Sequence, residues 1–224
     1  NGGHVFPAAI SMGTYAAYSA RDDKQFRVYS ANVPDAGVLP FSLDNLAFDK
    51  ADNWANYLKG MLFELAKQDL TIDHGFDLFV HGNLQDASGL SSSASMEMLM
   101  GEILHAAYGM KLDEVEMVKV GQQVENDYFG LNTGIMDQFA IGMGKKDQAI
   151  LLDTNTIEYE YAPLALGEYV VVIMNTMKRR ELTDSKYNER RAQCEEALRR
   201  LQTKLAIKTL GDLNEDEFDE NAYL

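Results

Sequence analysis

The segment 76–108 is the feature that most constrains how this chain folds. Residues 76–81 read as a strand, residues 82–91 are mostly small or polar, and residues 92–108 carry apolar side chains at helical spacing. Gly109 suits the end of that helix, because glycine readily takes the left-handed conformation that follows a helix. A strand, a small-residue loop and a helix in direct succession predict a mixed α/β fold with a functional loop between two ordered elements.

The last part of this loop, Gly89 to Ser93, has the chemistry of an anion site. Small side chains let backbone N–H groups approach an anion, and the start of a helix adds about half a positive charge. The hydroxyl groups can bind phosphate oxygen or a magnesium ion. The residues alone leave a second interpretation open, in which Ser91 or Ser92 only caps the helix. The segment matches neither a Walker A loop, nor a dinucleotide-binding loop, nor a nucleophile elbow.

A second group of polar residues lies in the segment 122–139. A helix predicted from Leu112 or Asp113 to about Phe129 carries Glu125 near its end, and Asp137 follows after Gly130. Two carboxylates on adjacent elements could act as a metal ligand and a general base. The alternative is structural, with Asp127 or Asp137 capping a helix and Glu125 in solvent.

The remaining periodicity alternates between strand and helix. We expect a helix from about Trp54 to Lys67, capped by Asp52, because apolar residues recur along one face there. The patterns also predict strands at 25–30, 149–152 and 169–174, and a charged helix over about 184–204. No repeat and no Ser/Pro-rich linker interrupts the sequence, which therefore reads as mixed α/β throughout.

Composition excludes several classes of function. The 35 acidic and 20 basic residues give a net charge of −15, which disfavours nucleic acid and anionic membranes as partners. A single cysteine, Cys194, excludes an internal disulfide and a four-cysteine zinc site. No apolar run approaches the roughly 20 residues that span a bilayer. We therefore expect a soluble protein of a reducing compartment.

Two motifs carry a resemblance to a known family. The run Gly89-Leu90-Ser91-Ser92-Ser93-Ala94-Ser95, followed by Thr133-Gly134-Ile135-Met136-Asp137-Gln138, resembles the GHMP small-molecule kinases, and among them the galactokinases. Residues 1–7, 54–60 and 175–191 are also similar to galactokinase motifs, in the same order. The resemblance implies a mixed β-sheet backed by helices. It assigns 1–165 to an N-terminal ATP- and sugar-binding domain, and 166–224 to a cleft strand, a long helix and the start of a C-terminal region.

The resemblance implies an activity and a role for each matching residue. The reaction is ATP-dependent phosphorylation of galactose at its anomeric hydroxyl, with Mg²⁺. The resemblance places Asp137 at the sugar C1 hydroxyl, with Gly134 and Tyr187 as further sugar contacts. It makes Ser93 and Glu125 ligands of the metal, and Trp54 and Tyr57 neighbours of the adenine. The residues that it places around the ATP phosphates are Gly89, Leu90, Ser91, Ser92, Ser93 and Ala94.

Two departures from the family pattern accompany this resemblance. First, Gln85 and Ala87 stand where the family's phosphate loop usually has proline and glycine. Second, the family's catalytic arginine, and the Glu, His and Asp of its sugar motif, are expected before Asn1. We therefore expect a fragment that is inactive alone, from a cytoplasmic monomer. The alternatives are an N-acetylgalactosamine or arabinose kinase, or a sugar- and ATP-dependent sensor that binds a repressor.

Overall fold

The computed structural model describes residues 2–68, 72–84, 89–175 and 185–224. The described chain forms two compact units. The larger consists mainly of Ile10–Met143, and the smaller of 2–9, Gly144–Ile173 and 185–224. All the predicted site residues except Tyr187 fall in the larger unit.

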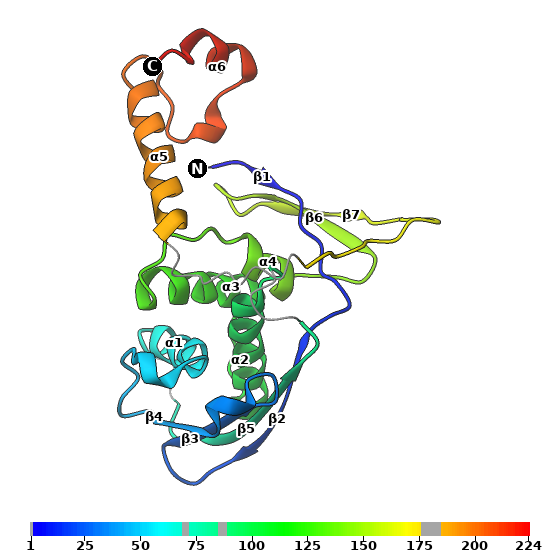
Figure 1. Ribbon diagram of the computed structural model, residues 1–224, viewed down its shortest axis with the longest axis vertical. Helices are drawn as coiled ribbons and strands as arrows, with labels where there is room; N and C mark the ends of the chain where they lie inside the picture. The colour runs from blue at the N-terminus through cyan, green and yellow to red at the C-terminus, as the bar shows by residue number, and fades with distance from the viewer. Residues whose placement is uncertain (1, 69–71, 85–88, 176–184) are drawn as a thin grey trace. The chain divides into compact units, whose positions relative to one another are not determined.

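A four-stranded mixed sheet underlies the larger unit (Figure 1). The strand order is β2-β5-β3-β4, with β3 and β5 parallel and the other pairs antiparallel. The strands are β2 (Thr14–Ala20), β3 (Gln25–Ser30), β4 (Leu39–Ser42) and β5 (Phe76–Gly82). The helices are α1 (Ala55–Ala66), α2 (Ser92–Tyr108), α3 (Glu114–Gln123) and α4 (Met136–Gly142), with the short 3-10 helices η1 (Pro34–Ala36) and η2 (Lys50–Asp52) and the π-helix η3 (Val124–Tyr128).

The sheet buries one of its faces. Every second residue of β3 and β5 is buried, including Phe26 and Val28 on β3 and Phe76 and Leu78 on β5. Phe26 stacks on Phe41 with ring centroids 4.7 Å apart and meets the edge of Phe76 at 4.8 Å. Burying a side chain of this kind contributes roughly 1.5–3 kcal/mol. Helix α2 packs against β2 of the sheet, and α1, α3 and α4 pack against α2 (Figure 1), which confirms the predicted mixed sheet backed by helices.

Local signals set the ends of the helices that lead to the site. The helix predicted over 92–108 is α2, and Gly109 ends it in the left-handed conformation with φ of 62°. Asp113 starts α3 by accepting a hydrogen bond from the Val115 N–H at 2.9 Å. The single helix predicted to about Phe129 is α3 continued by the π-helix η3, and Gly130, with φ of 72°, turns the chain after it.

The predicted cap of α1 is wrong. Trp54 occupies the cap position and makes no side-chain capping bond, whereas Asp52 belongs to η2 and pairs with Lys59. Lys59 is 2% exposed and also donates to the carbonyl oxygen of Ala47 at 2.6 Å. A buried ammonium group needs a counter-charge more than an accessible helix end needs a cap, so the carboxylate pairs with the lysine.

The smaller unit contains an antiparallel sheet of order β1-β6-β7. Its strands are β1 (His4–Val5), β6 (Gln148–Asp153) and β7 (Tyr159–Pro163), and its helices are α5 (Ser185–Leu201), η4 (Leu210–Asp212) and α6 (Glu215–Asn221). The strand predicted at 149–152 and the charged helix near 184–204 are confirmed by β6 and α5. The domain boundary between 165 and 166 stays a prediction.

The strand predicted over 169–174 is wrong. Tyr169 is 83% exposed and Met174 is 85% exposed, and within the described residues no strand pairs with this segment. An apolar run forms a strand only where a neighbouring strand accepts its backbone hydrogen bonds. The helices of the described ranges include none that is long and apolar enough to cross a membrane.

Candidate functional site

The loop that enters α2 adopts an unusual backbone. Gly89 has φ of 77°, and Ser91 lies in the left-handed region with φ of 58° and ψ of 42°. A non-glycine residue held there costs of order 1–3 kcal/mol, and such strain collects at functional sites. Ser91 makes no side-chain capping hydrogen bond, so its interpretation as a simple helix cap is wrong. The first-turn N–H groups of an α-helix have no partner within the helix. Gln85 and Ala87 lie outside the described residues.

A buried hydrogen bond joins the first turn of α2 to η3. The Ser93 hydroxyl donates to Oε1 of Glu125 at 2.9 Å, and the two residues are only 7% and 4% exposed. The interpretation of Glu125 as a solvated carboxylate is therefore wrong. The hydrogen bonds of this π-helical turn span one residue more than those of an α-helix, as from the Phe129 N–H to the Val124 carbonyl, and such turns occur frequently at functional sites.

The loop between η3 and α4 is held by two amide side chains. Oδ1 of Asn126 accepts from the backbone N–H of Thr133 at 2.8 Å and from its hydroxyl at 3.2 Å. Nε2 of Gln122 donates to the Thr133 carbonyl at 3.2 Å. These bonds fix the backbone just before Gly134, which is exposed, and Asp137 in the first turn of α4. Since Ile135 occupies the cap position, Asp137 is not a cap.

A third carboxylate lies beneath these residues. Glu97 is fully buried, and its Oε2 accepts from Nε2 of Gln138 at 3.0 Å. Burial raises the pKa of Glu97 well above its ordinary value, and the negative charges of Glu125 and Asp137 raise that pKa further. The structure thus gathers three carboxylates around the first two turns of α2.

The sequence analysis missed Glu97, Gln138 and the two loop-holding amides, Gln122 and Asn126. One signal was available for Glu97. It lies four residues after Ser93, three before Met100 and seven before Leu104, on the helix face that the apolar pattern assigns to the core. The other three have no comparable local signal, because their partners follow from the packing of α2, η3 and α4.

For the residues predicted to contact adenine and sugar, the structure gives burial and a few contacts but does not test their roles. Trp54 is 9% exposed, and its buried Nε1 has no hydrogen-bond partner within the part of the chain that the structure describes. Tyr57 is half-buried, and its ring lies 4.8 Å from that of Phe129. Tyr187 belongs to α5, and its side chain is outside what the structure describes. The roles predicted for these residues remain predictions.

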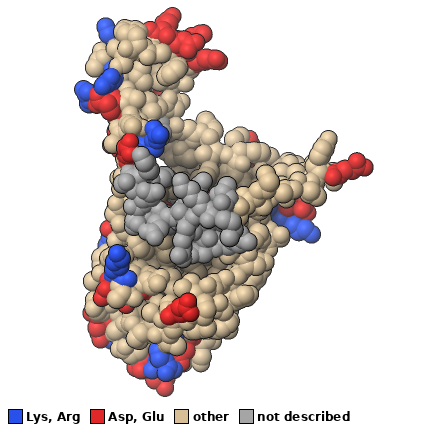
Figure 2. Space-filling view, viewed as in Figure 1, with Lys and Arg blue, Asp and Glu red and all other residues tan. Residues whose placement is uncertain are grey.

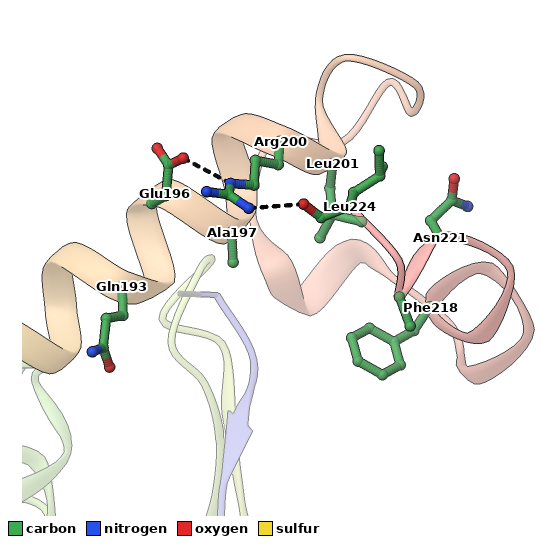
Figure 3. A pocket seen from close by; sticks show the side chains of 9 residues that line it. Gln193, Glu196, Ala197, Arg200, Leu201, Phe218, Asn221 and Leu224 are labelled. Carbon is green, nitrogen blue, oxygen red and sulfur yellow. Dashed lines mark hydrogen bonds and ion pairs between the residues drawn. The ribbon is translucent and has the colours of Figure 1, made fainter.

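A pocket of about 260 Å³ lies between α5 and α6 in the smaller unit (Figure 3). Its only basic lining residue is Arg200, which donates to Glu196 and to the backbone oxygen of Leu224. Acidic side chains gather over α6 (Figure 2). Because Arg200 is already paired with Glu196, this pocket does not offer a free cation to a phosphate group.

Known proteins resemble the chain in sequence. Residues 56–145 match the family described as the GHMP kinases N terminal domain. Over its whole length the chain is 97% identical to a galactokinase of Levilactobacillus brevis and 62% identical to one of Lactiplantibacillus plantarum. It spans 58% of the length of each of these relatives.

Solved structures resemble the fold. The crystal structure of Lactococcus lactis galactokinase complexed with galactose matches with a TM-score of 0.95 and 49% identity, over 100% of this chain and 57% of that one. Methanococcus jannaschii mevalonate kinase matches with a TM-score of 0.65 at 17% identity, over 97% of this chain and 68% of that one. The second likeness concerns the fold alone.

Proposed function

On the premise that residues 56–145 form a GHMP kinase N-terminal domain, we propose that the protein to which this chain belongs is a galactokinase. It transfers the γ-phosphoryl group of ATP to the anomeric hydroxyl of galactose. The observation that carries the proposal is the buried Ser93–Glu125 pair at the start of α2. The charges of Glu125 and Asp137 both act on the same buried residue, Glu97. The galactokinase relatives and the galactose complex of the Lactococcus lactis enzyme support the choice of sugar.

The start of α2 binds the ATP phosphates in this proposal. The first-turn N–H groups point along the helix axis, and the positive φ values at Gly89 and Ser91 support a loop that wraps an anion. Ser91 and Ser92 add hydroxyl donors, and Leu90 and Ala94 flank them in the loop and the first turn. This arrangement explains how a chain with a net charge of −15 binds a polyanion, since backbone groups supply the local positive potential.

Ser93 and Glu125 fit a magnesium ion. Their oxygens are 2.9 Å apart, which is the spacing of adjacent ligands in an octahedron with metal–oxygen bonds of about 2.0–2.1 Å. Magnesium usually takes one or two carboxylates and completes its shell with water and substrate phosphate. When bound, the ion neutralises charge that develops on the transferred phosphoryl group.

Asp137 acts on the sugar hydroxyl. Its side chain is half-buried in the first turn of α4, directly after the loop that Asn126 holds. The carboxylate accepts the proton of the C1 hydroxyl as that oxygen bonds to the γ-phosphorus, and the bond from the γ-phosphorus to the β–γ bridging oxygen breaks to release ADP. The exposed backbone at Gly134 lets a sugar approach closely.

The remaining assignments belong to the same proposal. Tyr187 contacts the sugar, and Trp54 with Tyr57 flanks the adenine. The protein works as a monomer in the cytoplasm, where its one cysteine stays reduced.

The test is ATP consumption by the full-length protein with galactose, N-acetylgalactosamine, arabinose or glucose as acceptor. We expect turnover with galactose and much less with the other sugars, and none from the 224-residue chain alone. Preference for N-acetylgalactosamine or arabinose would identify a different sugar kinase. A protein that lacks turnover, yet captures a repressor only when sugar and ATP are both present, would be a sensor.

A further inference from the structure

Glu97 and Gln138 form a buried polar pair that the reaction itself does not use. Both side chains are 0% exposed, and they come from α2 and α4, 41 positions apart in sequence. One hydrogen bond joins them, from Nε2 of Gln138 to Oε2 of Glu97. The two remaining oxygens, Oε1 of each residue, are buried and have no hydrogen-bond partner among the described residues. Leaving two acceptors unpaired in a core is costly, so the arrangement needs an explanation.

One proton accounts for both unpaired oxygens. A neutral carboxylic acid and a primary amide can form two parallel hydrogen bonds, in which the acid carbonyl accepts from the amide NH₂ and the acid hydroxyl donates to the amide oxygen. The first of these bonds is present. A proton on Oε1 of Glu97 turns this atom into the donor that Oε1 of Gln138 lacks. Full burial of Glu97 favours the neutral acid, as do the negative charges of Glu125 on η3 and Asp137 on α4.

We propose that the Glu97–Gln138 pair is a positioning element that locks α4 against α2 and thereby sets the carboxylate of Asp137. Gln138 follows Asp137 directly in the first turn of α4. A hydrogen bond that fixes Gln138 therefore also restrains the position of Asp137. On α2, Glu97 stands one turn after Ser93, and the same helix therefore anchors both the proposed metal ligand and the proposed base. This inference rests on the proposed function, because the role of Asp137 does.

Close packing around the pair supports this role. A Cβ atom built on Gly121 of α3 would lie 2.6 Å from Cε of Met98, 3.0 Å from Cγ of Gln138 and 3.3 Å from Oε2 of Glu97. Glycine at this position lets α3 approach the pair. The pair is thus enclosed by three helices and has no room to change rotamer without displacing one of them.

The experiment compares Glu97→Gln and Glu97→Leu in the full-length protein. The amide introduced by Glu97→Gln can form the same two bonds with Gln138, so this variant should keep kcat within about twofold of wild type. The leucine side chain in Glu97→Leu leaves the Gln138 amide unpaired, and kcat should fall by up to about 100-fold, as misplacement of a catalytic group can cost. The KM for ATP should change little, since the start of α2 is intact. Glu102→Gln, an exposed position on the same helix, is the matched control.

Two further measurements do not depend on turnover. The infrared spectrum of wild type at neutral pH should contain the carbonyl stretch of a protonated carboxyl group, and Glu97→Gln should lack it. Hydrogen exchange at the backbone amides of 136–142 should be faster in Glu97→Leu than in wild type, while exchange in Glu97→Gln should match wild type. If wild type makes no galactose 1-phosphate, the proposed function fails, whereas the spectrum and the exchange rates still decide whether the pair is neutral and holds α4.

Three results would overturn the inference. The first is a loss of kcat in Glu97→Gln as large as in Glu97→Leu, which would mean that the charge of Glu97 is used. The second is a wild-type spectrum without a protonated carboxyl signal. The third is a Glu97→Leu protein whose kcat and α4 exchange rates equal those of wild type.

Discussion

Asp77 on the exposed face of the larger sheet and two carboxylates among the helices, Glu97 and Glu125, are held in opposite ways. On the exposed face, Asp77 of β5 is bound by Arg27 and Arg21, and its side chain is more than a third exposed. Among the helices, Glu125 and Glu97 are buried, and their partners are the neutral side chains of Ser93 and Gln138. Within the described residues, no lysine or arginine pairs with either glutamate.

This difference shows what each arrangement is suited to do. A carboxylate neutralised by two arginines is satisfied and has little left to offer a ligand. A buried carboxylate beside a hydroxyl keeps its charge available for a cation, and a buried acid beside an amide can stay neutral and serve as a rigid contact. Substitutions that remove the charge of Glu125 or the hydrogen bond between Glu97 and Gln138 should therefore affect activity strongly, and those at Asp77 hardly at all.

The largest effect is expected from Asp137→Asn. The amide keeps the shape of the side chain but cannot accept the hydroxyl proton, so kcat for galactose phosphorylation should fall by roughly 10²- to 10⁴-fold. The KM for ATP should stay near the wild-type value, because the phosphate loop is unchanged. Steady-state kinetics of the full-length protein measures both, and a kcat close to wild type would remove Asp137 from the mechanism.

The next effect is expected from Glu125→Gln. The amide oxygen can still accept the Ser93 hydrogen bond, yet the charge that attracts the cation is gone. At metal sites, loss of a residue that only supports a ligand lowers activity roughly 10- to 100-fold, so loss of a direct ligand should lower activity at fixed Mg²⁺ by at least as much. Excess Mg²⁺ should restore part of the lost activity. Asp127→Asn, exposed on the same π-helix, is the control. An unchanged Mg²⁺ dependence in Glu125→Gln would exclude this glutamate as a ligand.

A smaller effect, on stability, is expected from Gly121→Ala. The added methyl group meets Met98 and Gln138 at distances that force the neighbours to move, and overpacking of this kind costs about 1–3 kcal/mol of unfolding free energy. In Gly134→Ala the new Cβ meets nothing within 4 Å, so stability should hardly change. Urea unfolding of both variants measures the difference. Equal stabilities would show that the helices around Glu97 are not tightly packed.

The smallest effect is expected from Asp77→Asn. The hydrogen bond from Arg27, with support from Arg21, lowers the pKa of Asp77 from 3.8 to about 2. A lowered pKa stabilises the folded state above pH 3.8, and that contribution disappears as the pH falls to about 2. The wild-type advantage over Asp77→Asn should therefore be small at neutral pH, shrink with added salt, and vanish near pH 2. A large, salt-independent loss at neutral pH would contradict the contrast between Asp77 and the two buried glutamates.

Local signals in the sequence predicted much of this fold. The range of α2 was predictable because its periodic segment lies between a polar loop and Gly109. The strand β3 was predictable because polar and apolar residues alternate along it, and the apolar ones are buried. Ser93, Glu125 and Asp137 were found through motif resemblance, since neither carboxylate alone favours catalysis over capping or solvent exposure. The structure adds that Ser93 and Glu125 are paired, while the catalytic role of Asp137 stays a prediction.

The features that were missed depend on contacts across the fold. Asp52 looked like a helix cap because the burial of Lys59 is not visible in sequence. The apolar run 169–174 looked like a buried strand because a pattern cannot show whether a sheet accepts it. The Glu97–Gln138 pair joins positions 41 apart, and only the packing of α2 against α4 reveals it.

The most direct measurement of the central claim is identification of the reaction product. Full-length wild-type protein is incubated with ATP, Mg²⁺ and galactose, and phosphorus and carbon NMR locate the new phosphate ester. The account predicts phosphate on the C1 oxygen of galactose from wild type, and almost none from Asp137→Asn at equal protein concentration. Phosphate on another hydroxyl, or equal yields from the two proteins, would contradict it.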